Sequence, residues 1–70
     1  MNTKELKVAM IRKDMTVDRL CNAIGISRSA WFRKVGGESE FTQGEINTIR
    51  HELDLNDEQI INIFFADEIA

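Results

Sequence analysis

The sequence predicts an all-α domain of five helices, and two features of the chain favour this class. Its 70 residues include no proline and only four glycines, so few positions interrupt a helix. Five short blocks repeat apolar residues every three or four positions, and each block follows a residue that can cap a helix. Because a chain of this length builds one hydrophobic core, we expect residues 1–70 to form a single domain.

The first two helices are indicated by their apolar stripes and by the residues at their ends. The first is expected over residues 3–13, beginning at Thr3 or just before it. The second has Thr16 as its N-cap and ends at Gly25, because glycine tolerates the left-handed backbone that often follows a helix. The two stripes consist of Leu6, Ala9, Met10, Val17, Leu20, Cys21 and Ile24.

The third and fourth helices also begin with capping residues. Ser27 caps the third, which covers residues 28–35 before a glycine pair stops it. Thr42 caps the fourth, and Glu45 at its third position completes a capping box. Phe41 is expected to anchor the preceding loop to the core. The buried stripe of the fourth helix consists of Ile46, Ile49 and Leu53.

The second and third helices are joined only by Gly25, Ile26 and Ser27. This connection is too short to reverse the chain, so the two helices must cross at a steep angle. A helix-turn-helix uses this geometry to lay its second helix, the recognition helix, in the major groove of DNA. The small side chain of Cys21 lets the helices touch, and Trp31 is expected to pack between them.

These residues resemble the lambda-repressor-like family, the Cro and repressor DNA-binding domains of phages and mobile elements. The segments ISRSAWFRKV, SEFTQGEI and INIFFA are similar to those of short phage-borne regulators in Gram-positive bacteria. The resemblance implies a five-helix lambda-repressor-like bundle with the helix-turn-helix at the second and third helices. It also implies a Cro-like or repressor-like transcriptional regulator of a phage or prophage, acting as a homodimer on a double-stranded DNA operator. We expect a cytoplasmic location, because the segment MNTKELKVAM lacks the apolar stretch of a secretory signal and no apolar run is long enough to span a membrane.

The resemblance assigns base contacts to the third helix. Its relatives read base edges with residues that match Arg28, Ser29 and Arg33, and arginine is the commonest bidentate reader of guanine. Phe32 could contact a thymine methyl group or lie half-buried against the fourth helix. Phosphate contacts are expected at helix N-termini, which attract anions, and at a basic side chain. These phosphate-binding candidates are Thr16, Ser27, Lys34 and Thr42.

The charges are segregated along the chain, although the net charge is −3. Residues 1–35 hold eight basic and three acidic side chains, a net charge of +5. Residues 36–70 hold one basic and nine acidic side chains, a net charge of −8. A local cationic surface attracts a polyanion even on an acidic protein. We therefore expect DNA to approach the first half, whereas Glu38 and Glu40 would repel phosphates if their loop faced them.

The fifth helix, capped by Asn56, is unusually apolar. Large apolar side chains cover more than one of its faces, which exceeds what so small a core absorbs. We therefore expect part of this helix to form a homodimer contact. The residues assigned to that contact are Ile61, Phe65 and Ile69.

Other functions receive less support from the sequence. A protein-binding anti-repressor or adaptor would keep the fold and use the acidic half or the fifth helix, and an antitoxin that represses its own operon would share the DNA contacts. One histidine, His51, and one cysteine, Cys21, provide no nucleophile-base pair or zinc ligand set. We expect no enzyme activity, no cofactor, no metal, no small-molecule substrate and no membrane span.

Overall fold

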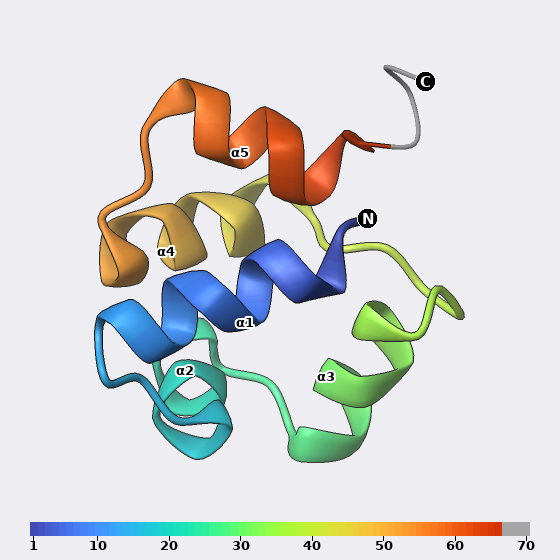
Figure 1. The fold of residues 1–70 in the computed structure, drawn as a ribbon. Coiled ribbons are helices and arrows are strands. Elements are labelled where there is room, and N and C mark those ends of the chain that lie inside the picture. Colours follow the sequence, from blue (N-terminus) through green and yellow to red (C-terminus); the bar gives the residue numbers. More distant parts are fainter. Residues whose placement is uncertain (67–70) are drawn as a thin grey trace.

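In the computed structural model, residues 1–66 are described, and they form five helices and no strand (Figure 1). The all-α class expected from the sequence is confirmed. None of these helices has the length and apolar character needed to span a bilayer. The helices are α1 (Thr3–Arg12), α2 (Val17–Ile24), α3 (Arg28–Val35), α4 (Gln43–Leu53) and α5 (Asp57–Phe64).

Each of the five helices is preceded by an N-cap residue whose side chain accepts a hydrogen bond from the backbone amide three residues later. The four caps expected at the later helices are confirmed, and Asn2, just before Thr3, caps α1. Thr42 and Glu45 form the expected capping box. A second capping box joins Asn56 and Gln59. The ends of α1 differ little from expectation, since the helix stops at Arg12 and not at residue 13.

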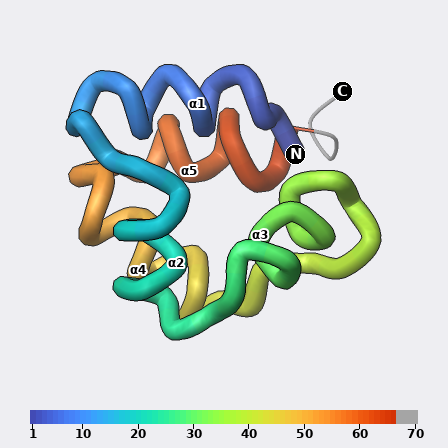
Figure 2. Tube along the Cα trace, turned by 90° about the horizontal axis from the view of Figure 1, so that it is seen from below, coloured from blue at the N-terminus to red at the C-terminus, as the bar shows by residue number. Residues whose placement is uncertain are grey.

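The core lies between two pairs of helices. α2 packs on α4, where Leu20 and Ile49 are fully buried, and α1 runs alongside α5 (Figures 1 and 2). The amide of Asn2 donates a hydrogen bond to the carbonyl of Ile63 over 2.7 Å, which fixes the start of α1 to α5. The buried apolar side chains are Leu6, Ala9, Met10, Leu20, Cys21, Trp31, Ile49, Leu53, Leu55, Ile60 and Ile63.

The turn after α2 directs α3 away from the rest of the bundle. Gly25 has a φ of 87°, in the left-handed region, and ends α2 as expected. In Figure 1, α2 is viewed nearly along its axis whereas α3 is viewed from the side, so the two helices cross steeply. Buried Cys21 lies at this crossing, with its Sγ 3.9 Å from the Ser27 carbonyl. Burial, and secondarily the charge of Asp18, raises the pKa of the Cys21 thiol, which keeps it a small neutral core group.

We predict that Ile49→Val will lower the free energy of unfolding by about 1 kcal/mol, because it removes one methylene from a site with no exposed surface. Urea denaturation measures this change. Ile11→Val is the matched control, since Ile11 is 75% exposed and the same deletion there should change stability by less than about 0.5 kcal/mol. Equal effects at the two positions would contradict the placement of the core.

Candidate nucleic-acid interface

The eight residues of α3 divide into an inner and an outer face. On the inner face, Trp31 is buried, and Ala30, Lys34 and Val35 are partly buried. The outer residues, at positions 28, 29, 32 and 33, are all exposed, and the helical period places them along one side of α3. We call this outer face the reading face, which consists of Arg28, Ser29, Phe32 and Arg33. The structure therefore brings together on one surface the four residues that the sequence assigns to base contacts.

The inner face of α3 is held by a row of aromatic rings. The Trp31 ring meets the edge of Phe41 at a centroid distance of 5.5 Å, and Phe41 meets Phe64 of α5 at 5.7 Å. Edge-to-face ring pairs of this kind add about 1 kcal/mol each to the free energy from apolar burial. The aromatic row thus connects α3 to α5 through the loop before α4, and it confirms that Trp31 is a core residue and that Phe41 anchors this loop.

Arg28, at the start of the reading face, has two neighbours. Its Nη1 donates to Oδ1 of Asp18 on α2 over 2.6 Å. Its guanidinium carbon lies 5.6 Å from the centre of the Phe32 ring, which is within range of a cation–π interaction. The Arg28 side chain is nonetheless 58% exposed, so solvent and any approaching ligand reach it.

Arg33 occupies the other end of the reading face. Within residues 1–66 its side chain makes neither a hydrogen bond nor an ion pair, and it is exposed. It lines a shallow depression with Ser29, Phe32 and Glu38. Phe32 is 53% exposed, so part of its ring is accessible on the outer face, as a contact with a thymine methyl group requires, and that contact stays a prediction. An unpaired guanidinium beside an exposed ring is suited to contact with a base edge.

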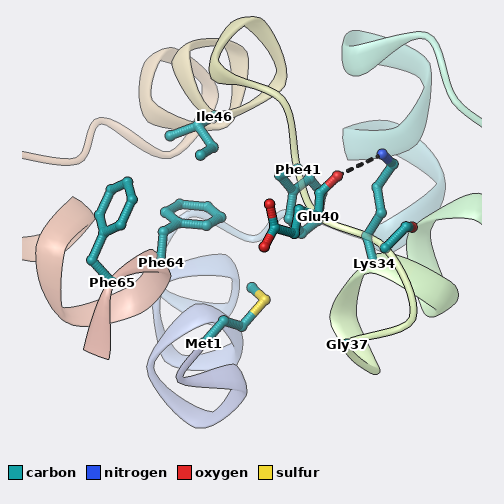
Figure 3. Close-up of a pocket in the computed structure, with 9 residues that line it drawn as sticks. Met1, Lys34, Gly37, Glu40, Phe41, Ile46, Phe64 and Phe65 are labelled. Carbon is teal, nitrogen blue, oxygen red and sulfur yellow. Dashed lines mark hydrogen bonds between the residues drawn. The ribbon is translucent and has the colours of Figure 1, made fainter. Parts of the chain in front are cut away.

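Lys34 is directed inward, unlike the two arginines. Its Nζ donates to the Glu40 carbonyl oxygen over 3.1 Å (Figure 3). The same Nζ lies 3.1 Å from Oε1 of Glu45 and 5.7 Å from the centre of the Phe41 ring. Only 14% of the Lys34 side chain and 17% of the Glu45 side chain are exposed. A phosphate contact would require this ammonium to leave its partners. In this structure Lys34 therefore joins α3 to the start of α4 and does not belong to the reading face.

The three remaining phosphate candidates lie where the sequence places them, at the starts of α2, α3 and α4. The hydroxyl oxygens of Thr16, Ser27 and Thr42 each accept a backbone hydrogen bond of 3.1 Å. Each hydroxyl proton can still be donated, and the first amides of a helix have no partner within it. All three positions are exposed, so they can donate hydrogen bonds to an anion.

The apolar candidates of α5 are also partly accessible. Ile61 and Phe65 are exposed, and Phe65 borders an open pocket of about 360 Å³ together with Met1, Ile46 and Phe64 (Figure 3). Ile69, the third residue assigned to a dimer contact, lies outside the described residues. His51 is exposed. Within residues 1–66, no three histidine, cysteine or acidic side chains come together as a metal site requires.

Sequence reasoning missed the two acidic partners of these cations. Asp18 is ten residues before Arg28, and Glu45 is eleven residues after Lys34. No local spacing relates such residues, because each pair forms across a turn whose geometry only the folded chain defines. The position of Asp18 in the first turn of α2 was the one available signal, since the starts of two crossing helices can lie close together.

A family model, the Cro/C1-type helix-turn-helix DNA-binding domain, matches residues 5–65. The match extends from the first turn of α1 to the end of α5 and includes the whole reading face. It agrees with the resemblance to lambda-repressor-like proteins that the helix-turn-helix segment carries. No curated protein matches the chain, and no solved structure does.

We predict that Glu45→Gln will lower the free energy of unfolding by about 1–2 kcal/mol at neutral pH, because glutamine can keep the capping bond but not the ion pair. The Thr42 amide, and then Lys34, lowers the pKa of the Glu45 carboxyl from its ordinary 4.5, against the opposing effect of burial. The stabilisation by ionised Glu45 is therefore present above pH 4.5 and is lost as the pH falls through the folded-state pKa.

Denaturation at neutral pH and in acid tests this pH dependence. The stability difference between the wild type and Glu45→Gln should shrink toward zero in acid, where the wild-type carboxyl is protonated. Glu58→Gln is the control, because Glu58 makes no ion pair within residues 1–66. Its effect should stay below about 0.5 kcal/mol. A Glu45→Gln difference that persists unchanged in acid would mean that charge is not the cause.

Proposed function

The chain belongs to the Cro/C1-type helix-turn-helix DNA-binding family, and we propose that it is a sequence-specific transcriptional regulator of a phage or prophage that reads the major groove with α3. The single observation that carries this proposal is the reading face, an exposed surface of two arginines, a serine and a phenylalanine on a helix whose other side is buried. Repression as a Cro-like or repressor-like protein would follow from occupying a promoter.

Base recognition is assigned to the four residues of the reading face. Arg28 and Arg33 each carry a planar fork of donors that matches the O6 and N7 acceptors of guanine. Ser29 can donate or accept at several bases, and Phe32 offers an apolar edge to a thymine methyl group. These contacts specify sequence, whereas phosphate contacts position the protein.

Phosphate contacts are assigned to Thr16, Ser27 and Thr42 through their hydroxyl groups and the helix amides behind them. Lys34 is left out because its ammonium is engaged by Glu40 and Glu45. Glu38 borders the reading face and opposes phosphate approach. We therefore expect modest affinity for DNA. We also expect this affinity to depend less on salt than it would if Lys34 contacted a phosphate.

A homodimer through α5 is assigned to Ile61, Phe65 and, beyond the described residues, Ile69. Two of these side chains are exposed although they are large and apolar, and such surface is commonly covered by a second subunit. Two reading faces in successive major grooves about 34 Å apart would then recognise a pseudo-palindromic operator.

A protein-binding anti-repressor or adaptor is the alternative, and two observations favour it. Arg28 is paired with a carboxylate, and Glu38 lies beside the reading face, so the local cationic charge is small. The two functions predict different behaviour on an anionic matrix. Retention on bulk DNA at low salt indicates a DNA-binding regulator, whereas an anti-repressor that uses another surface would not be retained.

We predict that Arg33→Ala will relax the preference at one operator position by about 1–3 kcal/mol, because Arg33 has no other partner within residues 1–66. Selection of bound sequences from a randomised duplex library, repeated at several salt concentrations, measures this loss. Arg50→Ala is the matched control, since Arg50 pairs with Asp57 at the start of α5. Its selected sequences should equal those of the wild type. If Arg33→Ala selects the wild-type operator unchanged, the assignment of the reading face is wrong.

We predict that Ile61→Lys will convert a dimer to a monomer while leaving the subunit folded, because Ile61 is exposed and lysine is a good helix former. Sedimentation equilibrium gives the oligomeric state, and thermal unfolding reports the fold. Ile11→Lys applies the same change to the exposed surface of α1 and should keep the dimer. A monomeric wild type at micromolar concentration would refute the α5 contact.

A further inference from the structure

We propose that Asp18 of α2 is a positioning residue that fixes the guanidinium of Arg28 for recognition of a guanine, and so determines specificity from outside the recognition helix. This inference rests on the proposed function, since it concerns how the reading face selects a base. It assigns a role to the one hydrogen bond that a side chain of that face makes to another helix within residues 1–66.

The hydrogen bond to Asp18 occupies only one corner of the Arg28 guanidinium. Nη1 donates to the carboxylate, and no other protein group within residues 1–66 accepts from Nη2 or Nε. Those two nitrogens lie on one edge of the planar group and point in parallel, which is the arrangement that binds O6 and N7 of a guanine together. The ion pair thus leaves a complete bidentate edge available for a base.

A second neighbour restricts the same group. The Phe32 ring lies under the guanidinium at 5.6 Å, while Asp18 holds its Nη1 corner. An arginine side chain loses much rotamer freedom when it binds, and a chain that is already held loses less. Asp18 and Phe32 therefore direct Arg28 before DNA arrives, and a fixed edge discriminates between bases better than a mobile one because it cannot turn toward another acceptor.

Stability does not account for this ion pair. The side chains of Arg28 and Asp18 are 58% and 66% exposed, and pairs so open to solvent contribute little to folding. The chain contains a matched pair elsewhere, because Arg50 and exposed Asp57 are joined between α4 and the start of α5. Both aspartates lie in the first turn of a helix, but only Asp18 contacts the reading face. Asp57→Asn is therefore the control for loss of a first-turn charge.

Neutralising Asp18 would have one effect on binding if Asp18 merely competes with DNA for Arg28, and another if Asp18 positions Arg28. If Asp18 only competed with DNA for Arg28, or only repelled phosphates, its neutralisation would tighten binding to every sequence and leave the preference intact. If Asp18 positions Arg28, its neutralisation weakens the preference at one base pair, whatever happens to affinity overall. The ratio of dissociation constants at that base pair separates the two effects.

The experiment uses the full chain and its selected operator. Arg28→Ala identifies the base pair that Arg28 reads, as the position whose preference it relaxes. Dissociation constants are then measured for the operator and for three duplexes in which that pair is replaced. Asp18→Asn should reduce the ratio between replaced and intact operator by about three- to tenfold, whereas Asp57→Asn should leave it unchanged. Thermal unfolding should show Asp18→Asn and Asp57→Asn to be equally folded.

A double variant makes the test specific to the pair. In an Arg28→Ala background, Asp18→Asn should cause no further loss at that base pair, because the residue it positions is gone. An unchanged ratio in Asp18→Asn, an equal loss in Asp57→Asn, or a further loss in the Arg28→Ala background would each overturn the proposal. If the wild type prefers no sequence at all, the proposed function fails first and this inference fails with it.

Discussion

The reading face depends on the burial of Trp31. An isolated helix of eight residues is not stable in water, so α3 needs contacts with the rest of the fold. Trp31 provides them, because it is the one buried side chain of α3 and joins the aromatic row. A buried side chain also fixes the rotation of its helix, since each residue turns the direction by about 100°. Because Trp31 lies on the same side of α3 as Ala30, Lys34 and Val35, which are partly buried, the remaining positions 28, 29, 32 and 33 face outward.

Residues of the acidic second half of the chain affect this face in two ways. Glu45 and the carbonyl of Glu40 hold Lys34 against the bundle, so they fasten α3 and remove a cation from the surface. Glu38 instead borders the depression beside Arg33. Among residues 1–66 the reading face therefore carries one unpaired and one paired guanidinium, with an acid beside them. If this face binds DNA as we propose, it would attract phosphates weakly, and base contacts would contribute more of the selection.

Local rules explain how much of the fold the sequence predicted. The caps at Thr16, Ser27, Thr42 and Asn56 were predictable, because each involves residues only three positions apart. The left-handed Asp54 that ends α4 was not, since aspartate adopts this conformation only occasionally. The helical period and a buried Trp31 predicted the exposure of Ser29 and Arg33, which lie opposite Trp31, but not that of Arg28 and Phe32, which lie to one side of it. Their contacts with DNA stay predictions.

The sequence could not predict which cations of α3 form ion pairs, because those pairs join segments that are distant along the chain. Arg28, Arg33 and Lys34 are three similar cations on one short segment. Within residues 1–66, however, Arg28 is paired, Arg33 has no ionic partner and Lys34 is nearly buried. Which carboxylate each one meets depends on the crossing of α2 with α3 and on the path of the loop before α4. Neither is encoded in the spacing of residues along the chain. The charge pattern of the sequence therefore locates the cationic segment, but it does not predict which of its three cations is accessible to a ligand.

The aromatic row also relates the two surfaces that we propose for DNA and for a second subunit. Phe64 belongs to α5, one residue before Phe65, and contacts Phe41, which in turn contacts Trp31. Closely packed rings shift little relative to one another, because protein cores are packed as densely as organic crystals. A dimer formed through Ile61 and Phe65 would thus hold each α3 in a fixed place relative to the two-fold axis. Operator spacing would then be set by packing within the subunit. Weakening the packing of Phe41 would therefore broaden the operator spacings that the dimer accepts, although Phe41 belongs to neither of the two proposed surfaces.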